Sequence, residues 1–230
     1  MLLNQNLKLK KAAKFGINQF GLELLPHSLS GVNLCVASSK SCRATCLVNS
    51  GHSGMKNSIA KKKYRTDLFL NDKVNFISLL VGEITYLETV YKNIQIRLNV
   101  FSDIEWENIK YDNKNIFEHF PKIKFFDYTK ISYRLKLDIK NYHVVFSGQE
   151  NNRHVWSKFL NRNNQVALVF TKVPETYHGY PVVSGDESDN LWQWKDRGVI
   201  LGLKYKNVII KDIKNKDLIK DNKLVIQNNV

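Results

Sequence analysis

All three cysteines of this 230-residue chain, Cys35, Cys42 and Cys46, lie within one stretch, residues 35–46. Independent placement would put three residues in so short a window in roughly one percent of such chains. Small residues separate the cysteines in a C-x6-C-x3-C pattern. Thiolates ligate iron–sulfur clusters and zinc, and a cluster held by three cysteines leaves one iron open to a substrate or cofactor. The segment therefore predicts a reactive metal site.

Two other interpretations of the cysteines stay open. His27 and His52 flank the segment, and either one as a fourth ligand would close the site into a structural zinc centre. The three cysteines could instead pack as small buried side chains without a metal. A complete disulfide framework is disfavoured, because the number of cysteines is odd.

The elements around the cysteines predict an α/β fold. Residues 14–26 alternate apolar with polar residues, which is typical of a strand, and two helices are expected over 56–72 and 73–93. From residue 94 onward, short apolar runs alternate with polar or helical segments. We expect parallel βαβ units that form an incomplete (β/α) barrel, with a doubly wound open sheet as the alternative. The expected organisation is a single domain over 1–230 with a C-terminal extension over 213–230.

The carboxyl ends of parallel strands form the face where ligands bind. Polar residues follow the expected strands at this face, and we expect them to converge on one cavity beside the three sulfurs. The residues predicted to be catalytic are Asp103, Asp127, Lys130 and Lys172. The residues predicted to bind a cofactor are Asn99, Ser102, Thr129, Ser147, Asp186, Glu187 and Lys204.

The acidic residues admit a second chemistry. Asp186, Glu187 and Asp189 lie in one loop, and carboxylates at strand ends can hold Mg²⁺ for phosphodiester cleavage. A nuclease of this kind leaves the cysteines unexplained. Acidic loops that balance a lysine-rich chain are the simpler interpretation.

The formal net charge of +14 favours polyanionic partners, so nucleic acid or a nucleotide is a candidate. One predicted helix concentrates basic residues, and tryptophans are present for base stacking. These residues are Lys56, Lys61, Lys62, Lys63, Arg65, Trp106, Trp156, Trp192 and Trp194. A solvated helix face and core packing are the simpler interpretations. No window approaches 18 uninterrupted apolar residues, so we expect no membrane partner.

A cysteine loop between the first strand and the first helix of an alternating chain resembles the layout of radical S-adenosylmethionine enzymes. The resemblance implies a [4Fe–4S] cluster on Cys35, Cys42 and Cys46, with S-adenosylmethionine as cofactor. The spacing differs from the C-x3-C-x2-C of that superfamily, and Thr45 stands where an aromatic residue is common.

A longer series of motifs resembles the bacteriophage gene product 88-like family. The motifs run from Asn33 to Asp212 and read "NLC", "CLVNSG", "RLNVFSDIEWE", "FFDYTK", "FSGQE", "PETYHGYPVVSGDESD" and "GVILGLKYK". This resemblance implies a phage protein in the cytoplasm of an infected bacterial host. We therefore expect a phage-encoded iron–sulfur enzyme related to radical S-adenosylmethionine enzymes. The alternative is a non-catalytic, cluster- or zinc-containing protein that binds nucleic acid.

Overall fold

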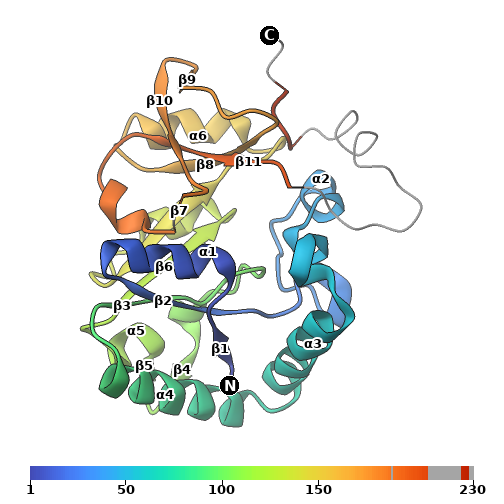
Figure 1. Cartoon of the computed structure of the whole chain (residues 1–230), viewed down its shortest axis with the longest axis vertical. Coiled ribbons are helices and arrows are strands. Elements are labelled where there is room, and N and C mark those ends of the chain that lie inside the picture. Colours follow the sequence, from blue (N-terminus) through green and yellow to red (C-terminus); the bar gives the residue numbers. More distant parts are fainter. Residues whose placement is uncertain (188, 207–223, 228–230) are drawn as a thin grey trace.

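A nine-stranded sheet runs through the centre of the protein (Figure 1). The structure is a computed structural model that describes residues 1–187, 189–206 and 224–227. The strands of this sheet are β1 (Leu3–Asn4), β2 (Asn18–Leu22), β3 (Ile94–Arg97), β6 (Lys124–Thr129), β7 (Tyr142–Ser147), β8 (Val166–Phe170), β9 (Thr176–Tyr177), β10 (Tyr180–Ser184) and β11 (Ile200–Lys204). A small separate sheet pairs β4 (Lys110–Tyr111) with β5 (Lys114–Asn115). The helices are α1 (Leu7–Lys10), α2 (Lys40–Ala44), α3 (Lys56–Asn71), α4 (Lys73–Val90), α5 (Ile116–His119) and α6 (Arg153–Leu160).

Most strands of the large sheet are parallel, which confirms the predicted α/β class. The order in space is β1-β2-β3-β6-β7-β8-β11-β10-β9. From β2 to β10 each strand pairs in parallel with its neighbour in this order, and β1 and β9 are antiparallel edge strands. Along this run the strand order follows the chain from β2 to β11 and reverses once, at β10. A reversal of strand order is also found at the switch point of a doubly wound sheet. Among the described strands β1 and β9 do not pair, so the sheet does not close into a barrel.

Different elements cover the two faces of the sheet. Adjacent residues on a strand point to opposite faces, and the fully buried pair Phe125 and Phe126 on β6 illustrates this. Phe125 packs in a core with residues of α3, α4 and α5. Phe126 packs in a second core with Leu9 of α1 and Leu191, and α1 crosses in front of β6 in Figure 1. The longer helices therefore lie on one face, and short N- and C-terminal elements cover the other.

The chain between β2 and β3 holds both the cysteines and the two long helices. The helices predicted over 56–72 and 73–93 are confirmed as α3 and α4, which are separated at Asp72. The Asp72 side chain accepts a hydrogen bond from the backbone N–H of Asn75 and so starts α4. The strand predicted over 14–26 is shorter, because a 3₁₀ turn over Lys11–Phe15 ends at Gly16, where φ is 68°.

Most of the predicted C-terminal extension, 213–230, lies outside the described residues. Its described part, 224–227, runs beside the end of β8, where Ile226 forms a parallel bridge with Phe170. Within the part of the chain that the structure describes, no helix is long and apolar enough to cross a membrane.

Candidate functional site

Local hydrogen bonds shape the segment that carries the three cysteines. The backbone N–H of Cys35 donates to Asn33 Oδ1 at 3.0 Å, which makes a tight turn. Ser39 caps α2 by accepting from the backbone N–H of Cys42 at 3.1 Å. Cys46 follows the end of α2. The three thiols therefore come from a turn, a helix and the residue after that helix.

Contacts with distant strands hold this cysteine segment in place. The backbone N–H of Ser39 donates to Gln149 Oε1 at 3.0 Å, and its hydroxyl donates to Glu150 Oε2 at 2.9 Å. Gln149 Nε2 donates in return to the carbonyl of Ala37 at 2.7 Å. On the other side, Cys35 Sγ donates to the carbonyl of Phe101 at 3.1 Å. The segment is thus tied to the carboxyl ends of β7 and β3.

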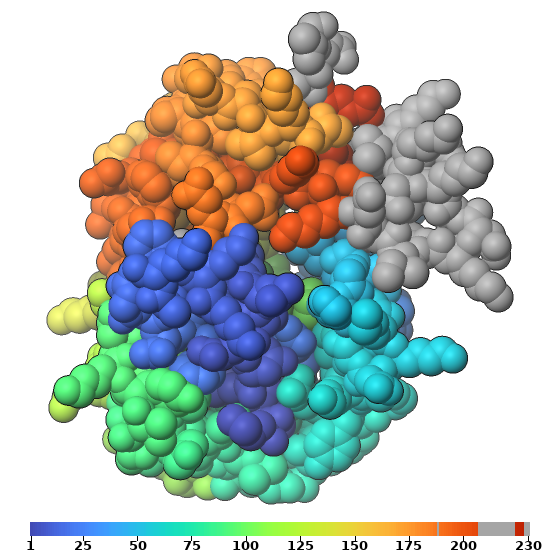
Figure 2. Space-filling model, in the orientation of Figure 1, coloured from blue at the N-terminus to red at the C-terminus, as the bar shows by residue number. Residues whose placement is uncertain are grey.

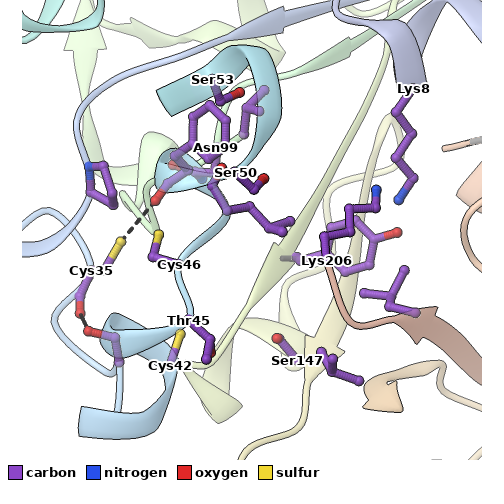
Figure 3. Close-up of a pocket in the computed structure, with 18 of the residues that line it drawn as sticks. Lys8, Cys35, Cys42, Thr45, Cys46, Ser50, Ser53, Asn99, Ser147 and Lys206 are labelled. Atoms are coloured by element: carbon purple, nitrogen blue, oxygen red, sulfur yellow. Dashed lines mark hydrogen bonds between the residues drawn. The ribbon is translucent and has the colours of Figure 1, made fainter. Parts of the chain in front are cut away.

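A cavity of about 470 Å³ lies at these strand ends, and all three cysteines line it. Figure 3 shows the labelled sulfurs at one end of the cavity, with Lys8 and Lys206 at the other. In Figure 2 the red-orange end of β11 meets the light-blue segment around residue 50 at the surface beside it. The predicted site residues that line the cavity are Asn99, Ser102, Asp103, Lys130, Ser147, Asp186 and Lys204. Those that do not line it are Asp127, Thr129, Lys172 and Glu187.

Lys130 places a cation beside the three sulfurs. Its Nζ donates to Ser147 Oγ at 3.0 Å, and its backbone N–H donates to Asp103 Oδ2 at 2.8 Å. Burial works to lower the pKa of Lys130, but Cys42, Asp103 and the other two sulfurs outweigh it and raise that pKa above its ordinary value. Lys130 therefore stays protonated, and its charge favours thiolates over thiols nearby.

The thiols of Cys35 and Cys46 are neutral in this arrangement. Burial raises the pKa of Cys35 to about 11 and the pKa of Cys46 to about 12. The backbone N–H groups and Lys130 oppose this effect only in part. A bound metal ion would displace the thiol protons, as metal ligation by cysteine requires.

Two of the predicted site residues use their polar atoms within the protein. Asn99 Oδ1 accepts from Ser102 Oγ, the backbone N–H of Ile104 and Trp106 Nε1, at 2.8, 2.9 and 3.2 Å. Asp103 Oδ1 accepts from Thr129 Oγ1 at 2.8 Å and from Arg134 at 2.9 Å. These bonds make Asn99 and Asp103 part of the cavity wall.

Asp127, predicted to be catalytic, is fully buried behind this wall. Its Oδ1 accepts from the backbone N–H of Asn99 at 2.7 Å, and its Oδ2 accepts from Tyr142 OH at 3.0 Å. Burial raises the pKa of Asp127 to about 7, because it outweighs the charges of Arg134 and Arg97 and these hydrogen bonds. The carboxyl group thus supports the site from the interior.

The raised pKa of Asp127 predicts a pH-dependent stability. A carboxyl whose pKa is higher in the folded state stabilises the fold below its unfolded pKa, and this contribution is lost as pH rises through about 7. Urea unfolding of the wild-type protein and of Asp127→Asn, from about pH 5 to about pH 8, should therefore show the wild-type protein losing free energy of unfolding relative to the variant. If the difference in free energy of unfolding between the wild-type protein and Asp127→Asn stays constant across this pH range, the pKa of Asp127 is not raised.

Sequence reasoning missed Lys8 and Arg97, two of the charged residues at the far end of the cavity. Lys8 Nζ lies 2.6 Å from Asp189 Oδ1, and Arg97 lies 3.0 Å from Asp189 Oδ2. Burial disfavours the ionised form of Asp189, but Lys8 and Arg97 outweigh it and hold the pKa of Asp189 below its ordinary value. Arg97, a charged residue at the end of the otherwise uncharged strand β3, was the available signal. With Asp189 paired in this way, the Mg²⁺ interpretation of the acidic loop loses a ligand.

The donors fit an iron–sulfur cluster or zinc by chemical type. Three thiols share one cavity with a protonated lysine. The Cys42 sulfur acts on the pKa of Cys35, and the Cys42 and Cys35 sulfurs both act on the pKa of Cys46. Within the described ranges, no group of three His, Cys, Asp or Glu side chains stands ready to hold a metal ion. Ligation therefore requires the cysteine side chains to turn toward one another.

Comparison with known proteins gives the family. The model of the family described as Gene product 88 matches residues 1–221. The chain belongs to this family. The match extends beyond the motif series from Asn33 to Asp212, so the Gene product 88 region includes α1, whose Leu7 and Lys8 line the cavity. No curated protein and no solved structure matches the chain.

Proposed function

We propose that this protein is a phage-encoded iron–sulfur enzyme whose cluster is held by Cys35, Cys42 and Cys46. The observation that carries the proposal is that the three cysteines line one cavity of about 470 Å³ at the carboxyl ends of parallel strands. Three ligands leave one iron of a [4Fe–4S] cluster open, and such a cluster supplies a coordination position for a substrate or cofactor. The chain belongs to the Gene product 88 family, and the resemblance of its motifs to bacteriophage proteins leads us to propose a role in the cytoplasm of an infected bacterium.

Charged residues at the two ends of the cavity suit a cluster at one end and a second ligand at the other. The Lys130 cation offsets the negative charge that three thiolates bring into a buried site. At the other end of the cavity, Lys8 and Arg97 share the carboxylate of Asp189, and Lys206 pairs with Asp186. Three cations against two carboxylates leave a positive excess there for an anionic or zwitterionic ligand. S-adenosylmethionine carries a carboxylate and an ammonium group that can ligate the open iron, and we propose it as the cofactor that occupies the cavity beside the cluster.

The strand order supports an incomplete (β/α) barrel as the framework. Consecutive parallel strands with their long helices on one face are the arrangement of a barrel, and the opposite face would then be its interior. Lys8, Arg97 and Asp189 lie on that interior side, where they line the cavity.

The test of the cofactor is spectroscopic. Anaerobically reconstituted and reduced protein should change its electron paramagnetic resonance spectrum when S-adenosylmethionine is added, because a new ligand at the open iron alters the cluster's electronic environment. S-adenosylhomocysteine and free methionine serve as comparison ligands. A spectrum that no ligand changes, from a fully loaded cluster, would argue that the site is closed.

One observation favours the alternative, a non-catalytic cluster- or zinc-containing protein that binds nucleic acid. His27 lines the cavity, and its Nε2 is buried without a hydrogen-bond partner among the described residues. Burial, with the charge of Arg43, lowers the pKa of His27 and keeps the imidazole neutral, as a ligand must be. His27→Ala should then lose zinc, while His52→Ala keeps it. Zinc content that both variants retain would exclude His27 as the fourth ligand.

A further inference from the structure

Positive charge collects where the parallel strands begin, at the opposite end of these strands from the cysteine cavity. We call this side of the sheet its amino edge. Because β3, β6, β7, β8 and β11 run in parallel, the residues that precede them emerge at one edge. Each of these strands is preceded or begun by an exposed basic residue. We call the set of seven the amino-edge cations: Lys92, Lys122, Lys124, Lys140, Arg162, Lys195 and Arg197.

These cations are not neutralised by ion pairs within the described part of the chain. The ion pairs there involve other basic residues. Two acidic residues, Asp138 and Asp196, lie exposed in the same loops. The amino edge thus keeps a positive excess, and an extended positive surface attracts polyanions.

Two of the four tryptophans lie among the amino-edge cations. Trp192 and Trp194 belong to the 3₁₀ turn Leu191–Trp194, which appears in orange on the side of the molecule away from α2 (Figure 1). Lys124 and Lys195 lie 5.3 and 5.2 Å from the ring centre of Trp192, and Arg197 lies 5.7 Å from that of Trp194. Both rings are partly exposed. Basic groups interleaved with accessible aromatic rings are typical of single-strand binding.

The basic helix α3 is a weaker candidate than its sequence indicates. Lys62 and Arg65 are buried in the interior. The Lys63 ammonium pairs with Asp67 at 2.6 Å. Only part of the predicted basic cluster therefore faces solvent, and Trp106 and Trp156 are buried in cores.

We propose that the amino edge is a docking surface for single-stranded nucleic acid. The positive charge of the amino edge indicates a polyanionic partner. The partly exposed tryptophan rings can stack on unpaired bases, which favours a single strand over a duplex or a lipid surface. The surface lies at the opposite edge from the cysteine cavity and does not depend on the function proposed for that cavity.

The test compares two triple variants of the full-length protein. Lys122→Gln, Lys140→Gln and Arg197→Gln remove three amino-edge cations, and Lys56→Gln, Lys61→Gln and Lys63→Gln remove three exposed cations from α3. Each set lowers the formal net charge of +14 by the same amount. Fluorescence anisotropy with a labelled oligothymidylate is measured over a series of salt concentrations. We expect the amino-edge variant to bind at least about tenfold more weakly at low salt, with its log–log salt slope reduced by about 2.

Three outcomes would overturn the proposal. Equal weakening of both triple variants would mean that only net charge matters. If the wild-type protein does not bind the oligothymidylate even at low salt, single-stranded nucleic acid is not its partner. Tighter binding to a duplex of the same length, or to phosphatidylserine vesicles, would assign the surface to another polyanion. The proposal is supported if the α3 variant keeps the wild-type affinity and the wild-type protein prefers single strands.

Discussion

Cys42→Ala is expected to remove nearly all bound iron and to abolish the visible absorption of an anaerobically reconstituted cluster. Cys42 lies on α2 between the other two sulfurs in the sequence, and its thiol faces the shared cavity. With two thiols left, the cavity lacks the minimum donor set for a cluster with one open iron. Iron, sulfide and zinc analysis of the protein measures this directly.

Lys40→Ala is the matched control for Cys42→Ala, because Lys40 is an exposed residue of the same helix. It should keep the full metal content. If the wild-type protein contains neither iron nor zinc after anaerobic preparation, the metal site does not exist. If Cys42→Ala keeps the wild-type content, Cys42 is not a ligand.

Arg134→Met is expected to lower the free energy of unfolding by about 3–5 kcal/mol, because it leaves buried carboxylates without their partner. The Arg134 side chain is 0% exposed, and its nitrogens lie 2.9 Å from Asp103 and 2.8 Å from Glu107. It also donates to Tyr142 OH at 2.8 Å. Urea unfolding followed by circular dichroism gives the difference.

Arg162→Met provides the comparison, since Arg162 is exposed and has no ion pair in the described chain. Its effect should stay within about 0.5 kcal/mol. A loss below about 1 kcal/mol for Arg134→Met would show that the buried network contributes little to stability.

The sequence predicted the fold class because strand and helix periodicities are local properties. The apolar spacing of α4 and the short apolar runs of β6 to β8 specify their elements directly. The extent of closure of the sheet is not local, because it depends on how edge strands such as β1 and β9 meet. The 3₁₀ turn that ends at Gly16 is local, but it was not anticipated because the apolar–polar alternation over 14–26 is typical of a strand.

The sequence predicted which residues line the cavity where these residues follow the ends of strands. It did not predict which side chains hydrogen-bond or ion-pair with one another. Asp103 and Lys130 lie where the strand-end argument placed them. That argument could not show that Asn99 and Asp103 bind other residues of the protein, nor that Asp127 points to the interior. Lys8 reaches the cavity from a short N-terminal helix, and no local pattern near residue 8 indicates a partner such as Asp189.

The hydrogen bonds from Ser39 to Gln149 and Glu150 join residues 110 and 111 positions apart. A ribosome adds about 5–20 residues per second, so the cysteines leave it roughly 5–20 seconds before the residues that hold their loop are made. During that interval the three thiols are exposed on a chain that lacks β7. Assembly of the proposed metal centre therefore requires the cysteines to stay reduced and unligated until the second half of the protein has been translated.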